Sequence, residues 1–304
     1  MLRLAFLVSI LACAGPAAAA SGASAPWWAW LAAVFAVSFV IGIVAVVAGV
    51  GGGVLFVPIV SGFFPFHLDF VRGVGLVFAL AGTLAAGPSL LRNRLASLRL
   101  AVPLALSGSI ASFAGALAGL ALPTEVVQTA LGATVLAIAV VVWRTGDAAA
   151  GTGEADALGT ILRLRGRYED PSDGVAVDWR TRRTLTGFAA FAGIGFLGGV
   201  FGLGAGFANV PVLNLVMAAP LKVAVGTSGL IISIVNSSAA WVYIHRGALL
   251  PALAVPAILG VMLGSRLGAS LLARTPASVV RRVVIAVLLI AGARALGRGT
   301  GLWP

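Results

Sequence analysis

The feature that most constrains the fold is a glycine-rich stretch of twelve residues that occurs twice. Residues 49–60 read GVGGGVLFVPIV and residues 202–213 read GLGAGFANVPVL, with five identical positions. The same spacing of 153 residues aligns Gly73 with Gly226 without a gap. The chain is therefore an internal duplication. Each copy places a glycine interruption directly after an apolar run of helical length, which is typical of transporter binding sites.

Composition places the chain in the membrane. Of its 304 residues 60% are apolar and only 10% are charged, and the mean hydropathy is +1.10. About a quarter of a soluble domain is normally charged, so this is an integral membrane protein. The formal charge of +11 does not indicate nucleic acid, because the basic residues sit mostly at the ends of apolar runs. The single cysteine, Cys13, excludes a disulfide framework and a cysteine-based metal site, and we expect no cofactor.

The first 25 residues have the layout of a cleavable secretory signal. Arg3 precedes an apolar core, and a run of small residues follows it. An additional helix is the alternative. If the signal is removed, the mature chain begins outside the cell.

Ten apolar runs predict the helical elements: 27–48, 54–64, 70–91, 98–120, 126–143, 185–201, 207–218, 223–244, 249–272 and 277–296. The runs that follow the two glycine stretches are short, and at about 1.5 Å per residue they cover little over half of a hydrocarbon core of about 30 Å. We therefore predict an all-α membrane protein with repeats of about five helical elements each, at 26–145 and 185–298. A polar loop at 146–184 joins them, and the broken short helices meet near the midplane.

Arginine placement predicts that the repeats are inverted. In copy one Arg92, Arg94 and Arg99 follow the third run, and the next connection has no basic residue. In copy two the larger basic group follows the fourth run instead. By the positive-inside rule the copies lie in opposite orientations, the polar loop is cytoplasmic, and residue 27 lies outside. That loop holds seven of the nine acidic residues, and we interpret it as a solvated linker without chemistry.

The glycine stretches predict an anion site. Unwound backbone in a bilayer leaves polar groups that need a partner, and the starts of the following half-helices direct N–H donors and a positive dipole end at the glycines. Close helix packing is the alternative role for these glycines. Polar side chains within the apolar runs supply further hydrogen-bond donors for the anion. Their alternative role is to hydrogen-bond one helix to another. The candidate substrate-binding residues are Gly51, Gly52, Gly53, Val54, Thr83, Gly204, Ala205, Gly206, Phe207, Asn209, Asn236 and Ser237.

Three basic residues are candidates for gating or anion attraction: Arg72, Lys222 and Arg266. Arg72 and Lys222 lie near the starts of their runs, where they attract an anion to the two mouths or anchor the helix ends. Arg266 lies near a predicted cytoplasmic end, where its side chain can snorkel.

Catalysis is not expected. Residues 226–229 read GTSG and resemble the GxSG nucleophile motif of rhomboid intramembrane proteases. His245 lies 17 residues beyond Ser228 on the same run, which is about 25 Å along a helix, so no base is in reach. Lys222 is not preceded by a phosphate-binding glycine loop, which excludes ATP hydrolysis within this chain.

The doubled glycine motif, the later VGTSG and the polar loop between the halves resemble the sulfite exporter TauE/SafE family of membrane permeases. The resemblance covers residues 27–297. The sequence departs from the family's triple glycine in copy two, which has Ala205 where copy one has Gly52. The resemblance implies a carrier for small sulfur-containing anions such as sulfite, sulfonates and sulfoacetate.

Together these observations predict a secondary transporter of the bacterial inner membrane that exports a small sulfur oxyanion, with sulfite as the leading substrate, by alternating access. Uptake of a sulfonate, sulfoacetate or another small organic anion, with or without a coupling ion, is the alternative. A rhomboid-like enzyme is the remote one.

Overall fold

The computed structural model describes residues 27–48, 51–64, 66–92, 96–144, 156–169, 176–204 and 206–271, with scattered positions between 285 and 301. In chain order its elements are α2 (Trp27–Ala48), α3 (Gly53–Phe63), α4 (Leu68–Arg92), α5 (Leu98–Ala121), α6 (Thr124–Arg144), α7 (Ala157–Ile161), β1 (Arg165–Glu169), β2 (Ala176–Arg180), α8 (Thr184–Phe201), α9 (Gly206–Pro211), the π-helical η1 (Val212–Val216), α10 (Leu221–His245) and α11 (Pro251–Leu271). The predicted helical class is confirmed. The predicted signal lies outside the described residues, as does most of the run at 277–296.

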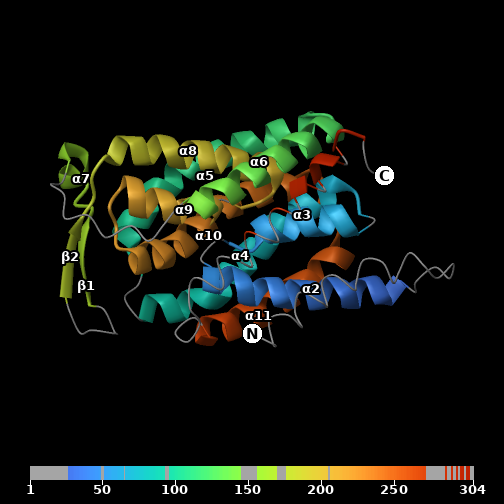
Figure 1. Cartoon of the computed structure of the whole chain (residues 1–304), viewed down its shortest axis with the longest axis horizontal. Coiled ribbons are helices and arrows are strands. Elements are labelled where there is room, and N and C mark those ends of the chain that lie inside the picture. The colour runs from blue at the N-terminus through green and yellow to red at the C-terminus, as the bar shows by residue number, and fades with distance from the viewer. Residues whose placement is uncertain are drawn as a thin grey trace.

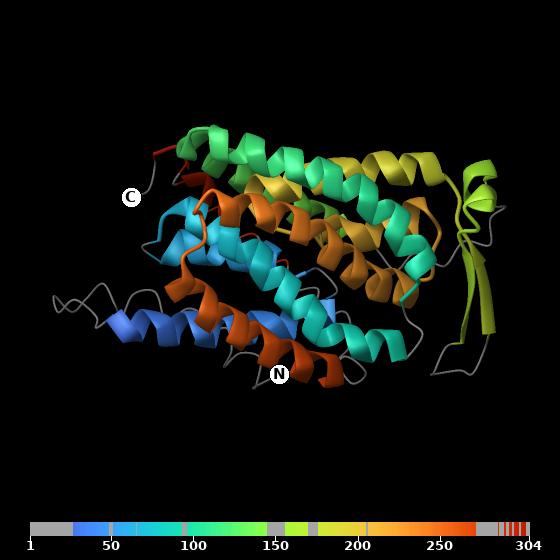
Figure 2. The ribbon, with the colours of Figure 1, turned by 180° about the vertical axis from the view of Figure 1, so that it is seen from behind.

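The long helices form two outer pairs with a central pair between them (Figures 1 and 2). The helices α2 and α11 pack along one side, and α5 and α8 pack along the opposite side. Between them lie α4 and α10, which contact each other, and the short helices α3 and α9 pack against this central pair. The 153-residue spacing relates α2 to α8, α4 to α10 and α5 to α11, so each outer pair combines a helix from each half.

Glycines bring the outer pairs into backbone contact. A Cβ added at Gly268 of α11 would lie 2.7 Å from the Ile43 carbonyl oxygen of α2. One added at Gly115 of α5 would overlap the Phe196 carbonyl oxygen of α8. These two contacts are counterparts under the 153-residue spacing. Small residues at such contacts let membrane helices approach closely.

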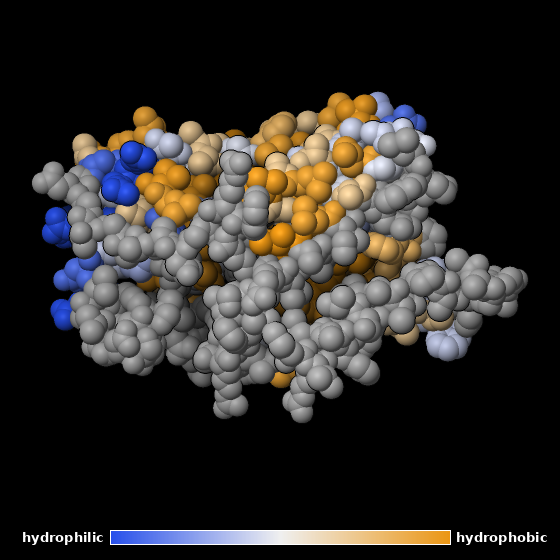
Figure 3. Space-filling view, in the orientation of Figure 1, coloured by the Kyte–Doolittle hydropathy of each residue, from blue (hydrophilic) through white to orange (hydrophobic). Residues whose placement is uncertain are grey.

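Six described helices are long and apolar enough to cross a membrane by length and composition: Trp28–Val46, Leu68–Pro88, Leu98–Ala121, Thr184–Phe201, Val223–His245 and Pro251–Gly268. Large apolar side chains are exposed at a spacing of four along α5, where Val102, Leu106 and Ile110 form one stripe. Figure 3 shows apolar surface over the middle of the molecule, while polar surface gathers at the end that carries β1 and β2. A surface of this kind faces lipid.

The polar segment between the halves contains more structure than the sequence indicated. It holds α7 and an antiparallel hairpin of β1 and β2, in which Arg165 pairs with Arg180 and Arg167 with Asp178. The hairpin lies beyond one end of the long helices and runs across their direction (Figure 1). We call this end of the bundle the hairpin end. The helices α5, α8 and α10 begin at the hairpin end, and α4 ends there. Two hydrogen bonds join these helix starts: the Ser97 N–H before α5 donates to Thr227 Oγ1 of α10 at 3.1 Å, and the Arg182 N–H before α8 donates to the Met217 carbonyl before α10 at 3.2 Å.

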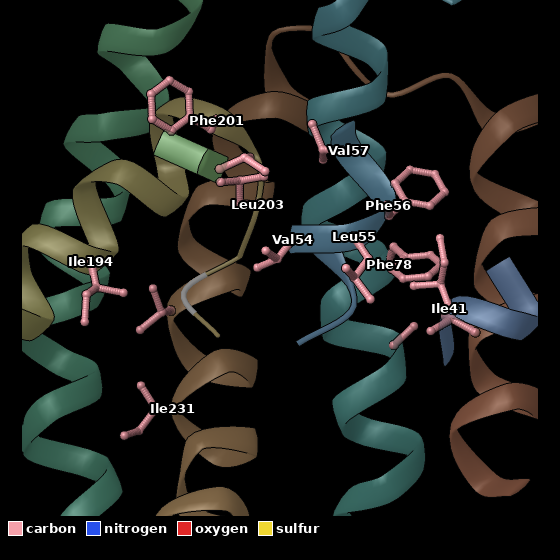
Figure 4. Close-up of a cluster of buried hydrophobic side chains, with 14 of the residues drawn as sticks. Ile41, Val54, Leu55, Phe56, Val57, Phe78, Ile194, Phe201, Leu203 and Ile231 are labelled. Atoms are coloured by element: carbon pink, nitrogen blue, oxygen red, sulfur yellow. The ribbon is translucent and has the colours of Figure 1, made fainter. Parts of the chain in front are cut away.

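The interior packs around α3. Ten of its eleven residues are buried, because this helix lies inside the bundle. Phe56 of α3 stacks on Phe78 of α4 with ring centroids 4.4 Å apart, and Figure 4 shows both rings beside Ile41 of α2. This packing fixes the start of α3 in the centre of the molecule.

Candidate functional site

The two glycine breaks meet in the centre of the bundle. Gly51 and Gly204, which are counterparts, have φ values of +79° and +71°, a conformation that glycine adopts without strain. A Cβ added at Gly51 would lie 3.2 Å from the Gly206 Cα, and one added at Gly53 would overlap the Leu203 carbonyl oxygen. The backbones of the two breaks are therefore in direct contact.

The first break opens onto a cavity of about 50 Å³. This volume is enough for roughly three or four water-sized groups. The walls come from α2, α4, α10 and α11 together with the break itself: Ala45, Val46, Gly51, Gly52, Ala79, Gly82, Thr83, Ala86, Val225, Ser228, Gly229, Ile232, Val261 and Ser265. On α4 and α10 these residues lie at the middle of the helix and on its half toward the hairpin end.

The start of α3 supplies backbone donors at this cavity. The helix begins at Gly53, with Gly52 as its N-cap. The N–H groups of Leu55 and Phe56 donate to the Gly52 carbonyl, at 3.2 and 2.9 Å. The earlier N–H groups of a helix have no acceptor within it, and they carry the positive end of the helix dipole. An oxyanion in the cavity is the kind of group that such a helix start stabilises.

Two serines add hydroxyl groups whose hydrogen-bonding capacity is unused. Ser228 of α10 and Ser265 of α11 are each 1% exposed, and their hydroxyl oxygens have no hydrogen-bond partner among the described residues. Buried polar atoms are rarely left in this state, so these two hydroxyls are candidates to donate to a bound group. Thr83, by contrast, is engaged, since its hydroxyl lies 3.0 Å from Ser233 Oγ. The cavity therefore joins a helix start to two buried donors.

The second break is filled. A Cβ added at Gly204 would lie 2.7 Å from Asn236 Nδ2, so this side chain occupies the place that the cavity takes beside Gly51. The helix α9 that follows is only six residues long. Asn209 on α9 is fully buried, and both ends of its side-chain amide lack a partner among the described residues. The described residues thus give the two breaks different surroundings.

Other predicted residues lie away from the cavity. Ser237 is exposed, and its hydroxyl donates to the Ser233 carbonyl at 2.7 Å. Arg266 is exposed as well. Ala205 and the side chains of Phe207 and Lys222 lie outside the described residues.

Arg72 lies near the start of α4, and its side chain is buried there. It is 1% exposed, and its Nη1 donates to Asp69 Oδ1 at 2.7 Å. Its Nη2 donates to the Val200 carbonyl, and its guanidinium lies 5.4 Å from the ring centroid of Tyr243. The side chain therefore links α4 to the last turn of α8, immediately before the second break.

Sequence reasoning did not select Ser228 or Ser265 as binding residues. Ser228 was considered only as a nucleophile, in the GTSG motif. The duplication could have pointed to Ser265, because its counterpart at the 153-residue spacing, Ser112, is also a serine. Among the described residues no three His, Cys, Asp or Glu side chains lie together as a metal site would require.

Comparison with known proteins adds independent information. The family model described as "Sulfite exporter TauE/SafE" matches residues 34–295. A relative from Bacillus subtilis (strain 168), "Probable membrane transporter protein YunE", is 30% identical over 106 residues, which cover 35% of this chain and 39% of that protein. The chain thus matches well under half the length of this relative. No solved structure matches.

Proposed function

The chain belongs to the sulfite exporter TauE/SafE family of membrane transport proteins, and on this premise we propose that it is a permease that exports a small sulfur oxyanion, foremost sulfite, across the inner membrane of a bacterium. The single observation that carries the proposal is the cavity beside Gly51. There a helix start converges with two buried hydroxyls that have no hydrogen-bond partner in the part of the chain that the structure describes. The same features suit an oxyanion, whose oxygens accept hydrogen bonds from all three sources.

In this proposal the oxyanion lies against the start of α3. It accepts hydrogen bonds from the hydroxyls of Ser228 and Ser265 and from the first N–H groups of the helix. Gly51 and Gly52 line the cavity without side chains, so the backbone can approach the anion closely. The remaining wall is mostly apolar, which strengthens each of these electrostatic contacts by excluding water.

We propose that the two halves form an inverted repeat that works by alternating access. Two features support this proposal. Each outer pair combines a helix from each half, and α4 and α10 run in opposite directions. Gly73 near the start of α4 meets Ala248, just after the end of α10, whereas Thr83 meets Ser233 further along both helices. Inverted halves of this kind alternate access by moving one half against the other around a central site.

The direction of transport follows from charge and voltage. The hairpin end carries the basic residues that predict a cytoplasmic location, and the cavity lies toward that end. A negative cell interior favours exit of an anion by about 2.3 kcal/mol per charge for each 100 mV. Export therefore requires no coupling ion. The alternative is uptake of a sulfonate or sulfoacetate, with a coupling ion, through the same cavity. The transport assay below distinguishes this alternative from sulfite export.

The test is transport of labelled sulfite, sulfate and a small sulfonate by the purified protein in liposomes, with Ser228→Ala and Ser265→Ala as variants. Each hydroxyl donates to a charged group in this proposal, so its loss costs about 1.5–3 kcal/mol, or about 10- to 100-fold in affinity. We expect sulfite flux that saturates and a raised KM in both variants.

Ser38→Ala is the matched control. Ser38 of α2 is also fully buried with an unpartnered hydroxyl among the described residues, but it faces Gly260 of α11 away from the cavity. Its replacement should leave KM unchanged. Equal KM values in the wild type and in both cavity variants would refute the proposed binding site. Absence of flux for every sulfur anion would refute the proposed substrate class.

A further inference from the structure

The 153-residue spacing gives every cavity residue a counterpart in the other half of the molecule. The counterpart of Ser265 is Ser112, and the counterpart of Val225 is Arg72. On α4 and α10 these counterpart positions lie on the halves away from the hairpin end. A long charged side chain, Arg72, therefore occupies the position in the first half of the chain that Val225 occupies in the second.

Arg72 and Tyr243 together hold the last turn of α8. The Arg72 Nη2 group donates to the Val200 carbonyl, and the Tyr243 hydroxyl donates to the Gly199 carbonyl at 3.1 Å. The guanidinium also stacks over the Tyr243 ring, and Asp69 accepts from its other end. These contacts bind the carbonyl end of α8, directly before the second break, to α4 and α10. They lie on the halves of α4 and α10 away from the hairpin end, whereas the cavity lies toward it.

The cluster lacks acceptors for some of its donors. The Nε of Arg72 is buried and has no hydrogen-bond partner among the described residues, and neither has the hydroxyl of Ser112, which is 0% exposed. A buried guanidinium with an unused donor is costly, and an ionisable side chain within a membrane is a candidate for a substrate path. The Val200 carbonyl is a neutral acceptor. An oxyanion would be a stronger one for the same guanidinium.

We propose that Arg72 is the anion-binding residue of the second half of the path and that it keeps this half closed until the anion arrives. The oxyanion replaces the Val200 carbonyl as acceptor for the guanidinium, which releases the end of α8 and opens the region around Ser112. This proposal rests on the proposed function, since it describes where the same oxyanion binds after it leaves the cavity. In this conformation Arg72 is bound to α8, and the half of the path that contains Arg72 is closed.

Transport and binding kinetics test Arg72 directly. The variants are Arg72→Gln and Arg72→Lys, assayed in liposomes with sulfite, with thermal shift by sulfite as the measure of binding in the cavity. We expect Arg72→Gln to lower the maximal rate at least 10-fold while the sulfite concentration for half-maximal thermal shift changes less than 2-fold. The Arg72→Lys variant keeps the charge and should retain an intermediate rate. Arg246→Gln, an exposed arginine just beyond α10, should leave both quantities unchanged.

Cysteine labelling provides a readout that a merely structural role would not move. In a chain whose Cys13 is replaced, Ser112→Cys should react more slowly with a small water-soluble thiol reagent than Ser265→Cys, which lines the cavity. Adding sulfite, or combining Ser112→Cys with Arg72→Gln, should accelerate the reaction of Ser112→Cys at least 5-fold. The reaction of Ser265→Cys should slow in sulfite.

The outcomes separate the two proposals. Wild-type transport of sulfite together with a normal rate in Arg72→Gln, or with unchanged labelling of Ser112→Cys, overturns the role of Arg72 and leaves the proposed function standing. A wild type that neither binds nor moves any sulfur anion overturns both. If Arg72→Gln does not fold, the transport rate of Arg72→Lys and the effect of sulfite on Ser112→Cys in the native background decide the question.

Discussion

Single glycines determine how closely the two breaks approach. A Cβ at Gly53 would overlap the Leu203 carbonyl of the other break, whereas one at Gly193 of α8 would meet nothing within 4 Å. We expect Gly53→Ala to lower the free energy of unfolding by about 1–3 kcal/mol, because the backbones must separate. Gly193→Ala should raise it by about 0.5–1 kcal/mol, because alanine is a better helix former. Thermal melting in detergent measures both, and equal effects would show that the contact between the breaks is loose.

Two buried asparagines offer a second test of the interior. Asn214 is satisfied in part, since its Nδ2 donates to the Ala219 carbonyl at 2.9 Å, whereas the amide of Asn209 has no partner among the described residues. We expect Asn214→Leu to destabilise the protein by about 1–3 kcal/mol. Asn209→Leu should be neutral or stabilising, because it removes buried polar atoms that lack partners. A lower melting temperature for Asn209→Leu would show that this amide has a partner in the membrane.

At the scale of elements, one carboxylate orders the start of two helices. Asp156 accepts from the Gly159 N–H at 3.2 Å at the start of α7, and from the Thr184 N–H and hydroxyl at 2.8 and 2.7 Å at the start of α8. Burial raises the pKa of the Asp156 carboxyl, but the hydrogen bonds from Thr184 and Gly159 outweigh it, so the pKa lies below its ordinary value of 3.8. The charged form is the one that these donors stabilise.

This lowered pKa makes the contribution of Asp156 to the stability of the protein depend on pH. The contribution of Asp156 to stability is complete above pH about 4 and is lost as the pH falls through the lowered value. Asp156→Ala should therefore cost about 0.5–2 kcal/mol at pH 7, and the difference from wild type should shrink below about pH 4. Melting curves at the two pH values measure this. Asp178→Ala, in an exposed strand position, is the control and should leave the melting temperature at pH 7 unchanged. A constant difference at both pH values would contradict the role of the carboxylate.

For the whole molecule, the arrangement predicts which residues face each side of the membrane. Arg167 lies in the hairpin, and Glu125 lies at the start of α6, at the opposite end of α5 from the Ser97–Thr227 contact. With Cys13 replaced, Glu125→Cys should react with an impermeant maleimide in intact cells. Arg167→Cys should react only in inside-out vesicles, because basic residues cluster at its end. Labelling of both from the same side would contradict the proposed topology.

The sequence determined the membrane class, the family and the course of the helices, because apolar runs have no other stable state in a bilayer and each must satisfy its backbone internally. The runs predicted at 27–48 and 98–120 match α2 and α5 to within one residue. It also located the breaks, since Gly51 and Gly204 stand where φ is positive. The inverted relation of the halves and the substrate remain predictions.

Only the tertiary structure decided which groups surround the breaks. The duplication made the two halves look equivalent, yet one break opens onto a cavity and the other is filled by Asn236. Ser265 lines the cavity at the first break from a helix more than 200 residues further along the chain, and the Arg72 side chain at the start of α4 binds the end of α8. Such contacts depend on how helices from different halves pack. Packing is a property of the assembled bundle, which the periodicity within each helix does not specify.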